Sequence, residues 1–303
     1  MMNCFFTNDV EHVSINGCMF ERMADEIDQN TLPRLLDVYE KYNVHSTFFI
    51  LASLAEIRPN IVRQIADRGQ EVASHGYCHD YRKAYDLLTL EQQKADLKRS
   101  KDILEQIAGK EVVSFRAPAL RVNEFTPQAL EETGFRIDSS VAQQRLDAFM
   151  SLGSKKKRAW YRAPRAIYNT AIDNLARRGD SSIIEVPVSS FGIPYIGTVM
   201  RLSPYFLNAI TRQLLCWEVR STQKPINFLF HPSEAVKEIK EEYTAIHRSN
   251  SWLGHLFSDV LRANIKKRNL NMHALDLLEH ELKYWQKRNA RFMCVNEVKV
   301  NSN

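Results

Sequence analysis

Residues 71–79 of this 303-residue chain read EVASHGYCH. The first four residues are expected to form a strand, and His75 and His79 follow that strand directly. Two imidazoles at this spacing can share one metal ion on a helix, or on a tight loop, and Gly76 favours the loop. Pairs of surface histidines show the same spacing, so this segment is informative only together with the rest of the chain.

On both sides of this segment, short apolar runs alternate with helical patterns. The other expected strands are 3–7, 46–51, 112–115, 135–137, 182–188, 226–230 and 292–295. The expected helices are 33–42, 60–67, 90–108, 126–133 and 270–287. This alternation is typical of parallel sheets with crossover helices. It predicts an α/β fold, a distorted or incomplete (β/α) barrel of about seven parallel strands, in which chemistry gathers at the carboxyl ends of the strands.

Reactive side chains stand directly after three further expected strands. Asp9 and Glu11 follow the first strand, and residues two apart in an extended segment point the same way. Arg116 and His231 each follow another strand. Each residue alone is a weak signal. Together with the histidine pair, they predict one site at the carboxyl edge of the sheet.

The order of these motifs resembles that of the polysaccharide deacetylases, carbohydrate esterase family 4, which has homology to the nodulation chitooligosaccharide deacetylase. The resemblance extends from Phe5 to about Glu234. The matching motifs are TNDVE at 7–11, HGYCH at 75–79, RAP at 116–118 and LFHP at 229–232. The second motif is the most specific of them.

The chain departs from the family pattern in three places. Many members have adjacent aspartates where this chain has Asp9-Val10-Glu11, which is similar to an Asp-x-Glu subgroup. Gly76 stands where serine or threonine is more usual. The fourth motif, an acid with a nearby tryptophan, has no clear counterpart, although GFRIDSS at 134–140, which contains Asp138, is similar to a segment of the subgroup. In addition, Arg162-Ala163-Pro164 repeats the Arg-x-Pro pattern. We prefer Arg116 for this motif, because it follows an expected strand.

The resemblance implies a metal-dependent N-deacetylase. Glu11, His75 and His79 would be the ligands of one divalent ion. Nitrogen and oxygen ligands suit zinc, cobalt, nickel or iron, and we take zinc as the default. Two imidazoles and one carboxylate leave coordination positions open, as a catalytic site requires.

The resemblance also implies the catalytic roles. Asp9 would be the general base, paired with Arg116, which would lower the pKa of Asp9 and keep it ionised. Protonated His231 would give a proton to the departing amine. The backbone N–H of Ala119 would help to hold the oxyanion. The residues expected to line the substrate site are Tyr77, Pro118, Ala119, Asp138 and Tyr205.

The composition suits one soluble catalytic domain over 1–303. Five cysteines occur without a Cys-x-x-Cys pair, which favours reduced thiols. The N-terminus lacks a secretory pattern, and the longest apolar run is far short of the roughly 20 residues of a membrane span. These features predict a cytoplasmic protein, with peripheral contact at the inner membrane face as a further expectation.

The net charge of +5 is unevenly distributed. Between 151 and 180, the basic residues are Lys155, Lys156, Lys157, Arg158, Arg162, Arg165, Arg177 and Arg178, and the acidic ones are Asp173 and Asp180. We interpret 141–180 as a basic insertion and 241–290 as a helical C-terminal extension. The insertion could meet phosphates or anionic lipid, or be a solvated surface. No nucleic-acid recognition motif accompanies the charge, so we expect no nucleic-acid partner.

These inferences predict deacetylation of an amino sugar. Its carrier would be a lipid- or nucleotide-linked precursor of bacterial envelope polysaccharide or lipopolysaccharide, because an export signal is not apparent. Three alternatives remain open: a deformylase of a lipid-linked amino sugar, a metal-free amidohydrolase of the same superfamily, and an inactive member that binds carbohydrate.

Overall fold

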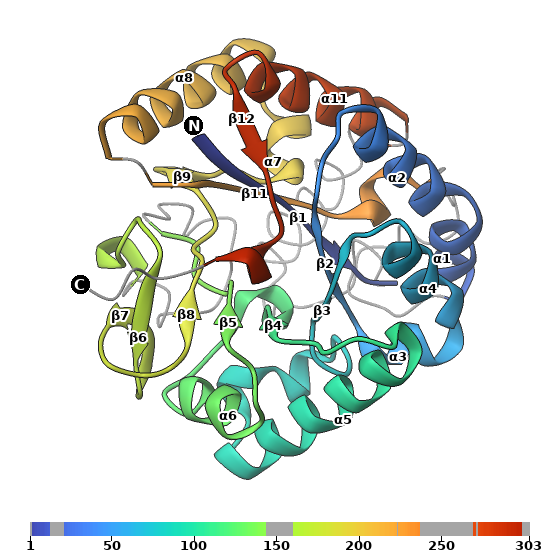
Figure 1. The fold of residues 1–303 in the computed structure, drawn as a ribbon, viewed down its shortest axis with the longest axis vertical. Helices are drawn as coiled ribbons and strands as arrows, with labels where there is room; N and C mark the ends of the chain where they lie inside the picture. The colour runs from blue at the N-terminus through green and yellow to red at the C-terminus, as the bar shows by residue number, and fades with distance from the viewer. Residues whose placement is uncertain are drawn as a thin grey trace, which may run out of the picture.

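The computed structural model of this chain describes residues 2–12, 21–143, 160–222, 224–236, 269–270 and 272–298. A curled sheet forms the centre, and helices surround it (Figure 1). The strands follow the order β11-β1-β2-β3-β4-β5-β8-β6-β7, and β12 pairs with β1.

The first seven strands of this order are parallel to one another. They are β11 (Ile226–Phe230), β1 (Met2–Val10), β2 (Thr47–Ile50), β3 (Glu71–Ser74), β4 (Ser114–Phe115), β5 (Ile137–Asp138) and β8 (Ile184–Glu185). The prediction of an incomplete (β/α) barrel with about seven parallel strands is confirmed. β4 and β8 are shorter than the sequence predicted, and β12 (Ala290–Phe292) begins two residues earlier.

Helices follow most of these strands and cover the outside of the sheet (Figure 1). They are α1 (Glu21–Glu26), α2 (Leu32–Lys41), α3 (Ala52–Ile57), α4 (Pro59–Asp67), α5 (Leu90–Ala108), α6 (Thr126–Glu132), α7 (Gly197–Leu202), α8 (Tyr205–Thr222) and α11 (Met272–Gln286). No helix in the described ranges is long and apolar enough to cross a membrane.

The ends of α5 show how the sequence sets an element. Thr89 and Gln92 form a reciprocal capping box at its start. Gly109 ends the helix in the left-handed conformation, at φ 66°, which glycine adopts without steric cost. The predicted helix over 90–108 is therefore confirmed at both ends.

Apolar layers cover both faces of the sheet. Alternation along β1 places Phe6 against the helices and Phe5 inside the barrel. The interior cluster consists of Phe5, Phe49, Ala73, Ile137, Val186, Met293 and Val295. Strands buried on both faces read as continuous apolar runs, which made them visible in the sequence. Thr7 and Asp9 continue the inward row beyond Phe5, so β1 carries polar groups toward its carboxyl end.

An antiparallel hairpin of β6 (Tyr168–Ala171) and β7 (Asn174–Arg178) extends the sheet beyond β8. It occupies part of the predicted basic insertion. The sequence did not predict these strands, because they are short and polar. Residues 144–159 of the insertion and 237–268 around the C-terminal extension lie outside the described residues, and α11 is the described helix of that extension.

Candidate active site

Five of the predicted residues converge at the carboxyl ends of β1, β3 and β11. Nε2 of His75 lies 3.9 Å from Oδ2 of Asp9 and 3.8 Å from Oε2 of Glu11. Nε2 of His79 lies 3.8 Å from the same oxygen of Glu11. Nε2 of His231 lies 3.9 Å from Oδ2 of Asp9 and 4.0 Å from Oε1 of Glu11. We call these residues the five-residue cluster.

The separations in this cluster are too long for hydrogen bonds. The polar atoms face a shared space instead of bonding to one another. Two ligands of a tetrahedral zinc ion would stand roughly 3.4 Å apart, given bonds of about 2.1 Å. As they stand, the acidic, histidine and cysteine side chains of the described residues form no group of three close enough to hold an ion. Oε2 of Glu11 lies 3.8 Å from Nε2 of His75 and of His79, about 0.4 Å more than that spacing.

The chemistry of His75 suits a metal ligand. Its Nδ1 lies 2.7 Å from the backbone oxygen of Arg116. A carbonyl oxygen only accepts, so Nδ1 carries the hydrogen and the lone pair of Nε2 faces the cluster. Burial lowers the pKa of His75 to about 4, so the ring is neutral near pH 7. The donors of Glu11, His75 and His79 therefore fit a divalent cation.

The expected ion pair between Arg116 and Asp9 is present. Nη1 of Arg116 donates to Oδ1 of Asp9 at 2.8 Å, and both side chains are buried. Burial alone would raise the pKa of Asp9, but Arg116, with His75 and His231, brings that pKa below its usual value. Asp9 is therefore ionised at neutral pH. Its second oxygen, Oδ2, faces the open side of the cluster.

Three residues that the sequence analysis missed hold Arg116 in place. Its guanidinium donates to the hydroxyl of Thr7 at 3.0 Å, and to the backbone and side-chain oxygens of Ser139 at 2.9 and 2.7 Å. Asn227 donates to Ser139 Oγ at 3.0 Å, and its own oxygen lies 3.1 Å from the Thr7 hydroxyl. The signals were faint: Thr7 precedes Asp9 by two residues, and Asn227 is a lone amide within an apolar strand.

The segment after β4 contains Pro118 and Ala119. Pro118 is buried, whereas Ala119 is exposed. Ala119 and Leu120 both have positive φ, at 53° and 52°. Residues other than glycine rarely adopt this conformation, and such strain gathers at functional sites. The N–H of Ala117 donates to Oγ of Ser140 at 2.9 Å, which anchors the start of the segment.

Asp138 lies deeper than a substrate-contacting residue would. It is fully buried, and Oδ1 and Oδ2 accept from the hydroxyl and N–H of Ser140 at 2.7 and 3.0 Å. Its carboxyl group also meets that of Glu185, and burial raises the pKa of both groups. A proton shared between the two acids lets them form a hydrogen bond. The structure thus places Asp138 behind the segment that begins at Arg116.

Tyr77 and Tyr205 point to other neighbours. The hydroxyl of Tyr77 donates to Glu56 at 2.9 Å, and Arg99 of α5 lies 3.6 Å from the centre of its ring. Tyr205 is 67% exposed at the start of α8, with Arg212 of the same helix 5.6 Å from its ring centre. Substrate contacts by these two residues stay predictions.

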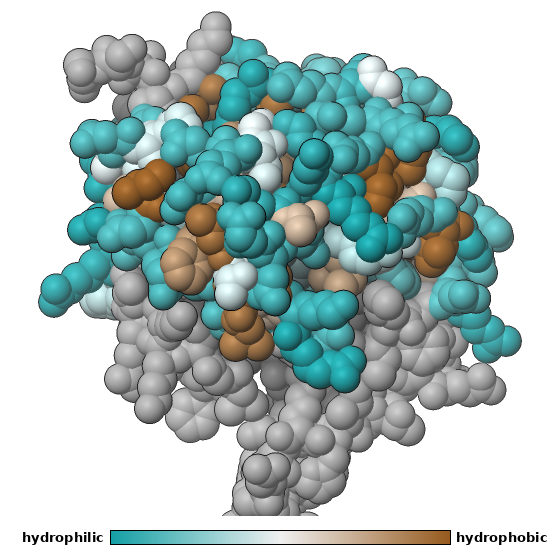
Figure 2. Space-filling model, turned by 90° about the horizontal axis from the view of Figure 1, so that it is seen from below, coloured by the Kyte–Doolittle hydropathy of each residue, from teal (hydrophilic) through white to brown (hydrophobic). Residues whose placement is uncertain are grey.

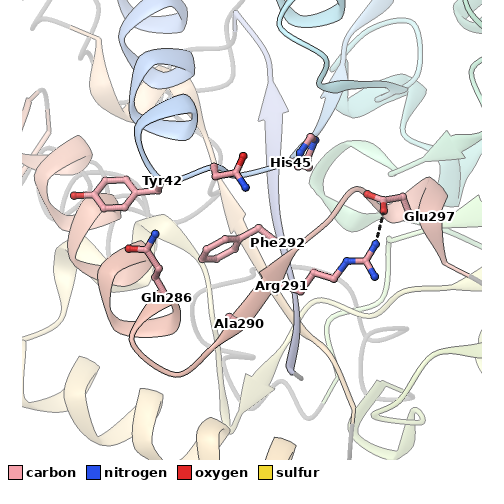
Figure 3. Close-up of a pocket in the computed structure, with 8 residues that line it drawn as sticks. Tyr42, His45, Gln286, Ala290, Arg291, Phe292 and Glu297 are labelled. Atoms are coloured by element: carbon pink, nitrogen blue, oxygen red, sulfur yellow. Dashed lines mark hydrogen bonds and ion pairs between the residues drawn. The ribbon is translucent and has the colours of Figure 1, made fainter.

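A pocket of about 620 Å³ lies away from the five-residue cluster. It opens beside Ala290–Phe292, which pairs with the amino end of β1, whereas the cluster stands at the carboxyl end of that strand. Figure 3 shows Arg291 and Glu297 in this pocket, joined by an ion pair at 3.3 Å. Predicted site residues do not line it. We therefore assign the chemistry to the cluster and not to this pocket.

A family model, polysaccharide deacetylase, matches residues 18–137. The match includes the histidine pair and Arg116, whereas both acids of the cluster and His231 lie outside it. The fold brings these outlying residues to the matched ones.

Two curated proteins are similar over part of their length. The peptidoglycan deacetylase-like protein FGM2 of Gibberella zeae is 34% identical over 111 residues, which is 36% of this chain and 32% of that protein. The peptidoglycan deacetylase of Helicobacter pylori is 30% identical over 110 residues, 36% of each chain. The matches thus span about a third of each of these relatives.

Solved structures show the fold. One described as a probable polysaccharide deacetylase from Pseudomonas aeruginosa PAO1 has a TM-score of 0.58 at 15% identity, covering 97% of this chain and 89% of the other. Puue allantoinase has a TM-score of 0.56 at 13% identity, covering 97% and 88%. At these identities the likeness concerns the fold alone, and two different named activities share it.

Proposed function

Because this chain carries a polysaccharide deacetylase domain, we propose that it is a metal-dependent hydrolase that removes the N-acetyl group from an amino sugar. The observation that carries this proposal is the five-residue cluster, in which an ionised acid, a second acid and three histidines face one space. A site that only bound carbohydrate would have no need of a base and an acid together.

Glu11, His75 and His79 would hold the ion. Zinc is our default, and cobalt, nickel or iron would suit the same donors. When bound, such an ion polarises a carbonyl and lowers the pKa of water. His75 is prepared for this role by its neutral ring and by the hydrogen bond that fixes its tautomer.

Asp9 is the proposed general base. Its Oδ1 is bonded to Arg116, so Oδ2 is the atom that takes a proton from the attacking water. The hydroxide adds to the acetyl carbon, and the carbon–nitrogen bond breaks. Nε2 of His231, 3.9 Å from Oδ2, is placed to protonate the departing amine. The products are acetate and the free amino sugar.

The geometry around His231 supports this assignment. Its side chain is 24% exposed, so a substrate can reach it. On its other side, Nδ1 lies 3.9 Å from Oε1 of Glu234. Glu234 is buried, accepts from the hydroxyl of Thr198 and lies 3.3 Å from Nε of Arg201. A negative group therefore stands behind the ring of the proposed acid.

We extend the proposal to a phosphate-linked substrate, a lipid- or nucleotide-linked precursor of envelope polysaccharide, met in the cytoplasm or at the inner membrane face. The basic stretch from 151 to 180 supports it. Arg162 and Arg178 are exposed. Arg165 and Arg177 are already paired, with Glu218 and Asp173. The other four basic residues of the stretch lie outside the described residues.

The test compares wild type with His75→Ala in metal content and in acetate release from N-acetylhexosamines. Each sugar is supplied free, nucleotide-linked and polyprenyl-phosphate-linked, beside its N-formyl analogue. His45→Ala is the matched control, because His45 is exposed in the pocket at the amino ends of the strands. We expect one divalent ion per chain and acetate release in wild type and control, and the loss of both in His75→Ala.

Other outcomes would redirect the proposal. Preferred release of formate would favour the deformylase. Hydrolysis without metal would favour the metal-free amidohydrolase. Binding of sugars without release of either acid would indicate an inactive member. Equal rates on free and phosphate-linked sugars would remove the phosphate part and leave the deacetylase.

A further inference from the structure

The buried face of α5 carries polar residues where an amphipathic helix places apolar ones. Gln93, Asp96 and Ser100 follow one another at spacings of three and four, which aligns them along one side of the helix. Gln93 and Ser100 are fully buried. Figure 2 shows the molecule from below, and the coloured residues on this face are mostly hydrophilic, with scattered hydrophobic ones. Buried polar groups need partners. Each of these three side chains has a partner between residues 74 and 88, and Gln93 also donates to Oδ1 of Asn123 at 2.7 Å.

Asp96 bonds to the turn between the two histidines. Its Oδ1 accepts from the backbone N–H of Tyr77 at 3.0 Å and from the hydroxyl of Tyr85. Gln93 secures Tyr85 from the same face of α5, because its amide donates to the Tyr85 backbone oxygen at 3.0 Å.

Ser100 supports the start of the same turn. Its hydroxyl lies 2.9 Å from that of Ser74, and Oγ of Ser74 accepts from the N–H of Gly76 at 3.1 Å. Backbone N–H groups of α3 bond to the other side of the turn. Ala52 donates to the oxygen of Gly76 at 3.0 Å, and the next residue donates to the oxygen of Tyr77 at 2.9 Å. Each peptide group at the centre of the turn thus has a fixed partner.

Gly76 shows how closely the support packs. Its φ is 73°, a conformation that favours glycine. A Cβ at this position would stand 3.0 Å from the hydroxyl oxygen of Tyr85 and 3.3 Å from Oδ1 of Asp96. The ring and the carboxylate therefore fill the space over the turn, and the turn cannot shift toward α5.

We propose that Asp96 and Tyr85 are positioning residues that set the place of His79 relative to His75. His75 is fixed by the end of β3 and by its bond to Arg116. His79 follows the turn, two residues after Tyr77, whose N–H is held by Asp96. The metal part of this inference rests on the proposed function. Removing a residue that orients a metal ligand without touching the metal typically weakens metal binding by about 10- to 100-fold.

The experiment measures Zn²⁺ affinity by calorimetry for wild type, Asp96→Ala, Asp96→Asn and Tyr85→Phe. Asp102→Asn is the matched control, because Asp102 is an exposed acid on the same helix. We expect Asp96→Ala to bind Zn²⁺ about 10- to 100-fold more weakly. Asp96→Asn should be partly rescued, because the amide oxygen can still accept both bonds. Tyr85→Phe, which loses one hydroxyl, should fall between wild type and Asp96→Ala.

A second readout separates this inference from the proposed function. Imidazole NMR signals of the metal-free protein should move for His79 in Asp96→Ala and Tyr85→Phe, and stay in place in Asp102→Asn. If wild type binds no Zn²⁺, the proposed metal site fails, and these signals alone decide the positioning role. Unchanged signals in folded Asp96→Ala and Tyr85→Phe, or unchanged Zn²⁺ affinity where wild type binds the ion, would overturn the inference.

Discussion

Arg116 and Asp9 pair inside the barrel, and Arg212 and Glu281 pair between α8 and α11. In each pair a guanidinium nitrogen lies 2.8 Å from a carboxylate oxygen, and both side chains are buried. The second carboxylate oxygens differ. That of Asp9 faces the five-residue cluster without a hydrogen bond to it, whereas that of Glu281 accepts from the hydroxyl of Tyr195.

The pKa values of the two acids move in opposite directions. Burial raises the pKa of Glu281, and Arg212 only partly offsets this. Burial would do the same to Asp9, but Arg116 is joined there by His75 and His231, and the pKa falls. The same kind of ion pair thus has two different outcomes. Asp9 is left ionised and able to accept a proton, whereas Glu281 cross-links two helices. The number of positive or polar neighbours around the acid decides which.

The largest expected effect concerns activity. Asp9→Asn should lower kcat by about 100- to 10,000-fold, because the amide cannot act as general base. Glu281→Gln, the same chemical change in the other pair, should keep kcat of the folded protein close to wild type. Acetate release per folded, metal-loaded chain is the measurement. Similar losses in both variants would mean that the barrel pair has no special role in the reaction.

The next largest effect concerns stability, and here the pair between the helices, Arg212 and Glu281, is expected to matter most. Glu281→Gln should lower the free energy of unfolding by about 3 kcal/mol, because the charge of Arg212 is left buried without its counter-ion. Glu279→Gln is the control. Glu279 lies on the same helix and is partly exposed, where it pairs with the exposed Lys41 at 3.1 Å and accepts from the hydroxyl of Tyr42, a bond that an amide oxygen can keep. That change should cost less than about 1 kcal/mol. Urea unfolding would measure both, and equal costs would contradict the distinction between a buried and a surface pair.

The two pairs also differ in how far the sequence revealed them. Asp9 and Glu11 were recognisable because alternation in a strand is local and sends both side chains the same way. Arg116 was recognisable because it follows a strand. Arg212 and Glu281 lie within helices, where nothing local distinguishes a buried ion pair from surface charges.

The rest of the site depended on contacts between distant segments. Thr7 and Asn227 are 220 residues apart, yet their side chains meet around Arg116. The hydrogen bond from the Tyr77 N–H to Asp96 likewise requires that α5 pack against the turn, which no spacing rule specifies. The family resemblance implied that Asp138 lines the substrate site. Its burial against Glu185 depends on β5 and β8 being neighbours.

That neighbouring pair of acids gives the smallest expected effect, a change in pH dependence. Burial raises the pKa of Glu185 and of Asp138 in the folded protein. A folded-state pKa above the unfolded value, about 4.3 for glutamate, means that the folded protein binds the proton more tightly. The stability that this provides is complete below about pH 4.3 and is lost as the pH rises toward the folded-state pKa.

Glu185→Gln replaces the protonated acid with an amide that cannot ionise, and its N–H can donate to Asp138. The variant should therefore lose less stability than wild type as the pH rises above about 4.3, as measured by urea unfolding. Parallel pH profiles would mean that the two acids do not hold a shared proton.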